Sequence, residues 1–218
     1  MLEAILFVLS EGCSWRAIDQ EELSWNTVYQ YFRYWCQREW FVAILQQVGA
    51  EVAAGWHFLD STHVKVHADG ANPPGGQALQ AIGRTKGGLN TKIHLIVNSR
   101  SQAITVCLSA GQEADISFAE RLVCDLPENS VVVADKAYDS DALRQSISNS
   151  GSRCCIPSRS NRRSPKPYSK TIYRRRHRIE NFFQKLKRFR RVATRYDKLA
   201  ETFLGFVSLA IIITQMAL

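Results

Sequence analysis

The chain has 218 residues, of which 45% are hydrophobic and 22% charged, and these proportions exclude a disordered or fibrous protein. Its net charge of +8 is unevenly spread: residues 159–198 hold 16 of the 28 basic residues and 2 of the 20 acidic ones, a local net charge of +14. The remainder carries 12 basic and 18 acidic residues, a net charge of −6. A basic segment on an acidic body favours a polyanionic partner.

Neither end of the sequence predicts a secreted or membrane protein. The apolar run 4–9 is too short for a signal sequence, so we expect the six cysteines to be reduced in the cytoplasm. The uncharged stretch 203–218 is shorter than the roughly 20 residues that a membrane span needs. We therefore expect a buried C-terminal helix.

Residues 1–55 predict helices. An apolar helix from Leu2 ends at Gly12, and Ser24 is placed to cap a second helix that continues to residue 48. Helix, short turn and helix is the outline of a DNA-reading helix-turn-helix. The region holds three basic and seven acidic residues, which is poor for binding phosphates. A helical hairpin that only covers a core is the alternative.

The periodicity changes at residue 56. Alternation and β-branched residues predict a first strand at 57–67 and, after a Gly- and Pro-rich loop at 69–90, two more. Helices and strands then alternate, with Asp115 expected to cap the first of these helices. The expected elements are strands 91–98 and 103–111, helix 114–126, strand 130–135, helix 139–151, strand 153–158, and helices 173–194 and 201–218.

This order predicts a mixed α/β sheet with helices on both faces, as in the ribonuclease-H-like fold. We expect two regions. Residues 1–55 would form a helical, helix-turn-helix-like region for DNA binding, and residues 56–218 a ribonuclease-H-like catalytic domain.

Three acidic residues stand out by position: Asp60 lies within the first strand, Asp135 ends the buried strand 130–135, and Glu180 lies on the basic helix. Open α/β sheets place catalytic groups at strand ends, and carboxylate oxygens suit Mg²⁺. Two such ions can clamp the attacking and leaving oxygens of a phosphoryl transfer. Each acid also has a structural interpretation, as a hydrogen-bonded strand residue (Asp60), a strand end (Asp135) or a surface ion pair with Arg176 (Glu180).

His63 and His67 lie close to Asp60 in sequence and suggest a zinc site. Strand alternation places both on the face opposite to Asp60. Satisfied or solvated histidines are the favoured interpretation.

The expected helix 173–194 carries one polar stripe, formed by Tyr173, Arg176, Glu180 and Lys187, within roughly 60° of one another at about 100° per residue. An adjoining apolar stripe would pack on the sheet, and the outer face is cationic. The helix would then bring Glu180 to the two aspartates, beside cations that meet phosphates. An amphipathic surface helix with solvated charges is the alternative.

The spacing Tyr173-x2-Arg176-x3-Glu180-x6-Lys187 resembles the Tyr-Arg-Glu-Lys signature of DDE transposases from bacterial insertion sequences. Residues 135–138 resemble the second-aspartate motif of these enzymes, and residues 59–67 resemble the first. Segments 75–94 and 182–204 are similar to the five-type subgroup of the insertion-sequence-four/five-like superfamily. The resemblance covers nearly the whole chain from residue 2.

The resemblance implies a transposase in which water attacks a phosphodiester at the end of the element, and the freed 3′-hydroxyl then attacks target DNA. Asp60, Asp135 and Glu180 would bind two Mg²⁺ or Mn²⁺ ions, and Tyr173, Arg176 and Lys187 would contact DNA. The expected partners are double-stranded DNA, as terminal inverted repeats and target, and further copies of the chain in a homo-oligomer on DNA. No membrane is expected, and the place of action would be the cytoplasm, with the nucleoid.

Relatives carry some tens of residues before the equivalent of Leu2, so we expect either that translation starts upstream, for example through frameshifting, or that the N-terminal DNA-binding part is truncated. One alternative is therefore a catalytically silent DNA-binding remnant that inhibits a full-length transposase. Another is a ribonuclease-H-like nuclease that acts on other nucleic acid structures.

Overall fold

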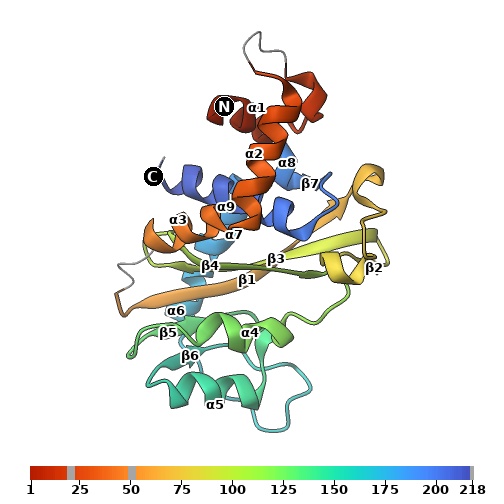
Figure 1. Cartoon of the computed structure of the whole chain (residues 1–218). Coiled ribbons are helices and arrows are strands. Elements are labelled where there is room, and N and C mark those ends of the chain that lie inside the picture. The colour runs from red at the N-terminus through yellow and green to blue at the C-terminus, as the bar shows by residue number, and fades with distance from the viewer. Residues whose placement is uncertain (19–22, 49–52, 217–218) are drawn as a thin grey trace.

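The computed structural model describes residues 1–18, 23–48 and 53–216, and a seven-stranded mixed sheet crosses its middle (Figure 1). The strands pair in the order β2-β3-β1-β5-β6, while β4 also pairs with β3 and β7 with β1. Their bounds are β1 Trp56–Val66, β2 Gly83–Thr85, β3 Gly88–Asn98, β4 Ala103–Ala110, β5 Val131–Val133, β6 Arg153–Cys155 and β7 Thr194–Arg195.

The strand directions confirm the predicted fold class. Strands β1, β3 and β4 form an antiparallel meander, and β5 and β6 run parallel to β1. The resulting order β4-β3-β1-β5-β6 is the ribonuclease-H-like topology. Strand β2 was not predicted, because the Gly-rich segment around it was interpreted as loop; it forms a short hairpin with the beginning of β3.

Helices cover both faces of the sheet (Figure 1). The larger apolar core lies between one face and the N- and C-terminal helices, and the smaller core lies under α4 and α5 on the other face. Strand alternation divides β1 between them, since Phe58 belongs to the larger core and Leu59 to the smaller one. The helices are α1 Leu2–Glu11, α2 Trp25–Gln37, α3 Trp40–Val48, α4 Ile116–Val123, α5 Asp141–Asn149, α6 Lys170–Tyr173, α7 His177–Leu186, α8 Arg190–Ala193 and α9 Ala200–Met216.

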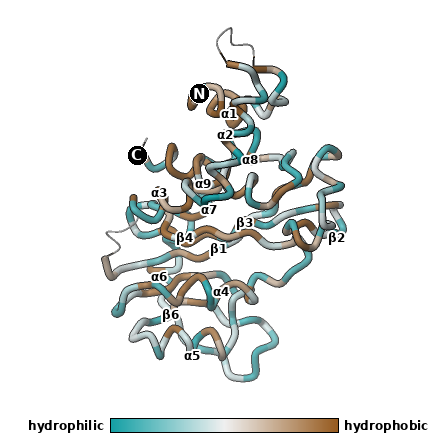
Figure 2. Tube along the Cα trace, viewed as in Figure 1, coloured by the Kyte–Doolittle hydropathy of each residue, from teal (hydrophilic) through white to brown (hydrophobic). Residues whose placement is uncertain are grey.

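Helix α9 is apolar around its whole circumference, which is typical of a helix inside a core. Figure 2 shows hydrophobic residues along α9 and the central strands. The predicted buried C-terminal helix is therefore confirmed. Within the described part of the chain, no helix is long and apolar enough to cross a membrane.

Two predicted helices are interrupted. The helix expected from residue 25 to 48 divides into α2 and α3 at Glu39, whose φ of 54° is left-handed. The helix expected over 173–194 divides into α6, a 3₁₀ turn at Arg174–Arg176, α7 and α8. The prediction of one continuous helix was wrong: both pieces pack on β1 and α9, but α7 also packs on β3 whereas α8 packs on α1. Tertiary contacts override local helix propensity here.

Helices α1, α2 and α3 share the larger core with the sheet. Helix α1 packs on α8, and α2 and α3 pack on α9. These contacts agree with helices that cover a core, while DNA reading by this region and the division at residue 55 stay predictions.

Candidate active site

The pairing of β1 with β5 places two of the predicted site residues, Asp60 and Asp135, on neighbouring segments of the sheet. Strands β1 and β5 pair in parallel from Trp56 with Val131 to Phe58 with Val133. Two residues further along each chain, Asp135 therefore leaves β5 beside Asp60. The Asp135 carboxylate accepts a hydrogen bond from the backbone N–H of Ala137 at 2.7 Å, which begins a 3₁₀ turn.

Asp60 is largely buried on the face of β1 that carries the larger core. One carboxylate oxygen accepts from the backbone N–H of Ser61 at 2.9 Å, and the other accepts from Nη1 of Arg176 at 2.6 Å. Burial raises the pKa of Asp60 above its ordinary value, and the negative charge of Asp135 raises it further, while Arg176 and Ser61 oppose the shift. The charge of Asp135 thus acts on Asp60.

Arg176 joins the strand to the basic helix. Its Nη1 binds Asp60 and its Nη2 donates to Glu180 on α7, so one guanidinium bridges two of the three predicted carboxylates. The side chain of Glu180 is 48% exposed, whereas those of Asp60 and Arg176 are 18% and 19% exposed. The ion pair between Glu180 and Arg176 that the sequence left open as a structural interpretation is present, and it lies in the site.

Tyr173 and Lys187 lie on either side of Arg176 and Glu180 along the chain. Burial raises the pKa of Tyr173, the charge of Arg176 opposes this shift, and the charge of Asp135 adds to it. The Nζ of Lys187 donates to the backbone carbonyl of His63 on β1 at 3.0 Å. Arg176 and Lys187 of the predicted stripe therefore both contact β1, although the helix that was expected to carry the stripe is broken.

Carboxylate oxygens are the ligands that Mg²⁺ prefers, so Asp60, Asp135 and Glu180 suit a divalent ion chemically. In residues 1–18, 23–48 and 53–216, no three His, Cys, Asp or Glu side chains are gathered closely enough to hold a metal. The guanidinium of Arg176 instead pairs with two of these carboxylates, Asp60 and Glu180.

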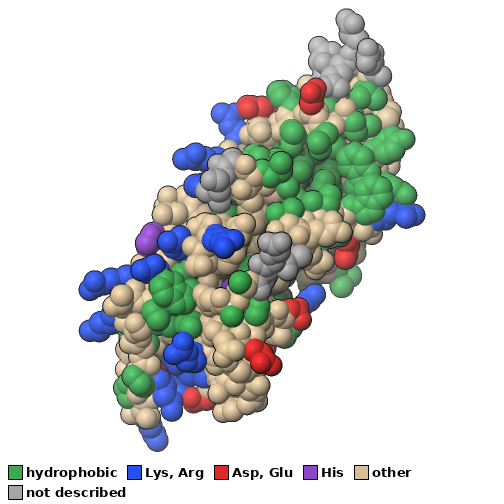
Figure 3. Space-filling model, turned by 90° about the vertical axis from the view of Figure 1, so that its left-hand side faces the viewer, with side chains coloured by type: hydrophobic (Ala, Val, Ile, Leu, Met, Phe, Trp, Pro, Cys, Tyr) green, Lys and Arg blue, Asp and Glu red, His purple; other side chains and the backbone are tan. Residues whose placement is uncertain are grey.

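Part of the basic segment is structural. Arg191 and Arg195 are 5% and 0% exposed; Arg191 pairs with Asp197, and Arg195 donates to Thr91 at 2.7 Å. Two of the 16 cations of residues 159–198 are therefore buried in the fold, and the predicted polyanion contact rests on the others. Figure 3 still shows Lys and Arg side chains gathered along one edge of the molecule.

Several polar residues next to the site were not predicted as functional, namely Ser61, Lys92 and Asp115. Lys92 pairs with His63 across β1 and β3. Because His63 and Ser61 are two residues apart on β1, strand alternation places Lys92 on the same face of the sheet as Ser61. Asp115 was expected to cap α4, but its side chain makes no cap hydrogen bond and turns to the sheet instead.

Comparison with known proteins gives consistent matches. Residues 57–215 match the family model "Transposase DDE domain", and residues 1–45 match "Putative transposase of IS4/5 family". The chain is 37% identical over 123 residues to the putative transposase for insertion sequence element IS6501 of Brucella ovis, a match that covers 56% of this chain and 95% of that protein.

Among solved structures, the piggyBac transposase synaptic complex with hairpin DNA aligns with a TM-score of 0.45 and 13% identity. The alignment covers 73% of this chain and 47% of that one, so this chain spans about half the length of the solved protein.

Proposed function

The chain belongs to the DDE transposases of the IS4/5 family of insertion sequences, and we propose that it cleaves DNA at the ends of such an element and transfers the freed strand to target DNA. The observation that supports the proposal is the bridge between two segments that are distant in sequence: Arg176 binds both Asp60 of β1 and Glu180 of α7. Asp135 follows β5, which pairs in parallel with β1 next to this bridge.

The three carboxylates are the proposed ligands of two Mg²⁺ or Mn²⁺ ions. When bound, such ions stabilise the charge on the attacking and leaving oxygens of a phosphoryl transfer. Asp60 and Asp135 approach from the sheet, and Glu180 approaches from the helix. Arg176 competes for the same carboxylates, so we infer that its guanidinium leaves at least one of them before both ions are held.

The cations of the site are proposed to bind the DNA backbone. Arg176 binds Asp60, Lys187 binds the carbonyl of His63 on the same strand, and Tyr173 ends the short helix directly before the turn that holds Arg176. Side chains of these types commonly contact phosphate oxygens. The proposed partner is double-stranded DNA of the inverted repeats and the target, bound by a homo-oligomer in the cytoplasm with the nucleoid.

The two proposed regions divide this work. The α/β part from residue 56 onward carries the chemistry, and the helices of residues 1–55 contribute to DNA binding.

Strand cleavage of DNA that bears the ends of the element, with Mg²⁺ or Mn²⁺ added, tests the proposal. Asp60→Asn, Asp135→Asn and Glu180→Gln are each expected to abolish cleavage while DNA binding remains. Asp69→Asn is the matched control, because Asp69 is 73% exposed and pairs with His67. Continued cleavage by Asp60→Asn would remove that residue from the site.

The same assay separates the alternatives. DNA binding without cleavage by the unaltered chain would favour an inhibitory remnant. Sequence-independent cutting of branched or hybrid substrates would favour a general nuclease.

A further inference from the structure

A polar cluster lies on the face of the sheet opposite to Asp60, and the proposed function does not use it. We call Ser61, Lys92, Asp115 and Tyr138 the Asp115 cluster. Lys92 and Tyr138 are 6% and 1% exposed, so these polar groups are largely removed from water. Buried polar groups are costly unless they are paired, and they are retained where their pairing has a use.

Asp115 is held by two side-chain donors. Its Oδ1 accepts from Nζ of Lys92 and from Oγ of Ser61, each at 2.8 Å. Lys92 also donates to the backbone carbonyl of Glu113 at 2.6 Å, which fixes the segment that leads into α4. Burial alone would raise the pKa of Asp115, but the hydrogen bonds from Lys92 and Ser61 hold it below its usual range. Asp115 is therefore an ionised and fixed acceptor.

This arrangement replaces a helix cap. Asp115 occupies the N-cap position of α4, yet its side chain accepts no bond from the helix backbone. An Asp that caps a helix stabilises it by about 1 kcal/mol. A residue that departs from a local rule of this kind is more often found near a functional site.

Ser61 connects the cluster to the candidate active site. Strand alternation sends its hydroxyl to Asp115 on one face, while its backbone N–H donates to Oδ1 of Asp60 at 2.9 Å. The hydrogen bonds therefore run without interruption from Lys92 through Asp115 and Ser61 to Asp60.

Tyr138 extends the cluster toward Asp135. It lies in the 3₁₀ turn that Asp135 begins, and its buried hydroxyl has no hydrogen-bond partner within the described residues. Burial raises the pKa of this phenol, and the negative charges of Asp115, Asp60 and Asp135 raise it further.

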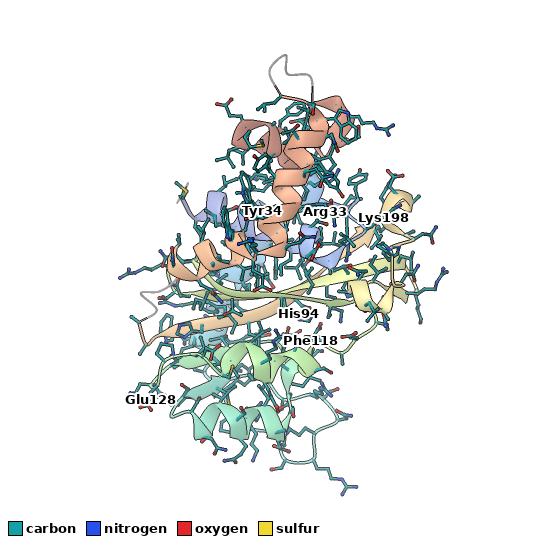
Figure 4. The ribbon with its side chains drawn as sticks, viewed as in Figure 1. Arg33, Tyr34, His94, Phe118, Glu128 and Lys198 are labelled. Atoms are coloured by element: carbon teal, nitrogen blue, oxygen red, sulfur yellow. The ribbon has the colours of Figure 1, made fainter. Side chains whose placement is uncertain are left out.

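Residues of the smaller core pack between the sheet and α4, next to the Asp115 cluster. His94 of β3 and Phe118 of α4 point toward one another between sheet and helix, with ring centroids 4.8 Å apart (Figure 4). Nε2 of His94 lies 2.7 Å from Oγ of Ser109 on β4. Helix α4, which begins directly after Asp115, thus packs on the sheet through an aromatic contact.

We propose that Asp115, held by Lys92, is a positioning residue of the active site: through the hydroxyl of Ser61 it fixes β1 at Asp60 from the opposite face of the sheet. The proposal rests on the proposed function, because it takes the carboxylate of Asp60 as a metal ligand. Outer groups that orient metal ligands typically change metal affinity or activity by 10–100-fold when they are removed.

A double-mutant cycle between Asp115 and Ser61 tests the connection. Mn²⁺ binding is measured by electron paramagnetic resonance of the free ion, and DNA affinity is measured in parallel. Asp115→Ala and Ser61→Ala are each expected to weaken Mn²⁺ binding by about 10-fold. The double variant is expected to lose no more than either single variant, because both substitutions cut the same connection. DNA affinity is expected to stay within about twofold, which a general loss of structure would not permit.

Ser61→Thr keeps the hydroxyl and is expected to bind Mn²⁺ like the unaltered chain. The comparison of Ser61→Thr with Ser61→Ala tests the connection through the hydroxyl even if Asp115→Ala does not fold. Wild-type Mn²⁺ affinity in Ser61→Ala, or additive losses in the double variant, would overturn the proposal.

Asp60→Asn distinguishes the positioning role of Asp115 from metal binding by Asp60 itself. If Asp60→Asn abolishes Mn²⁺ binding and Ser61→Ala leaves it unchanged, the positioning role alone fails. If the unaltered chain binds no Mn²⁺, the proposed function fails and the positioning role fails with it.

Discussion

Arg176 donates a hydrogen bond to Asp60 at 2.6 Å across a sequence separation of 116 residues, and the same guanidinium donates to Glu180. One cation thus holds a strand carboxylate and a helix carboxylate that would otherwise repel each other. A divalent ion that bound both carboxylates would take over this task, so Arg176 and the metal compete for the same groups.

The first prediction concerns the pKa of Asp60 in the metal-free protein. Burial already raises this pKa, and the positive charge of Arg176 opposes the shift. Arg176→Gln removes that charge and is expected to move the pKa of Asp60 higher still. Carboxyl ¹³C NMR titration measures it directly. Arg174→Gln is the control, since Arg174 is exposed and adjoins the site only in sequence. An unchanged midpoint in Arg176→Gln would contradict the bridging role.

Lys187 provides a prediction about DNA binding. The logarithm of the DNA-binding constant falls linearly with the logarithm of the salt concentration. For duplex DNA, each phosphate contact that a protein loses reduces the magnitude of this slope by about 0.9. Lys187→Gln is expected to lower the slope by that amount and to weaken binding for all sequences alike. Arg100→Gln, which alters an exposed cation on the turn between β3 and β4, is expected to change neither. Equal slopes for the unaltered chain and Lys187→Gln would remove Lys187 from the interface.

Asp139 anchors the basic loop that precedes α6. Its buried carboxylate accepts from Nε of Arg144, Nη1 of Arg162 and the backbone N–H of Arg159 at 2.8–2.9 Å. Asp139→Ala is expected to open the loop and to speed trypsin cleavage after Arg159 or Arg162 by at least ~10-fold, because hydrogen bonds to charged groups are the strong ones. Asp141→Ala is the control, since Asp141 also pairs with Arg162 but is 79% exposed. Equal cleavage rates in the two variants would show that Asp139 does not hold the loop.

The fold was largely predictable because hydrophobic periodicity marks the long elements. The alternation in β1, the apolar run of β5 and the Gly12 end of α1 are local signals, and the structure follows them. The interruptions at Glu39 and after Leu186 depend on tertiary packing, which no local pattern records.

The candidate site was predictable to a similar degree. Spaced motifs indicated that Asp60, Arg176 and Glu180 would meet, and they do. Local charge density could not distinguish exposed cations from Arg195, whose burial is decided by partners on other elements. The role of Asp115 was hidden because an Asp before a helix predicts a cap, and only the register of β1 and β3 shows what it binds.

A fourth prediction tests the packing of α9 against α2. A Cβ on Gly205 would overlap with Sγ of Cys36, so Gly205→Ala forces the two helices apart. We expect this overlap to lower the free energy of unfolding, measured by urea denaturation, by about 1–3 kcal/mol. This loss exceeds the gain of about 1 kcal/mol in helix propensity that Ala has over Gly. Gly87→Ala, whose nearest neighbour is 3.8 Å away, is the control. Adding Cys36→Ala to Gly205→Ala is expected to restore part of the loss, and no recovery would contradict the overlap.

The last prediction follows from His94, which is fully buried beneath α4. Burial lowers the pKa of His94 from 6.5 to about 4, so the unfolded chain takes up this proton at a higher pH than the folded one. The neutral, buried His94 therefore leaves the free energy of unfolding at its full value above about pH 6.5. This free energy falls as the pH drops toward 4, by on the order of 3 kcal/mol at most. His94→Gln removes the titrating group, and its free energy of unfolding is expected to fall less than that of the unaltered chain over this window. His67→Gln changes a half-exposed imidazole and is expected to keep the wild-type dependence. Parallel curves for the unaltered chain and His94→Gln in urea denaturation between pH 7 and 4 would show that His94 is not the residue whose protonation opens this core.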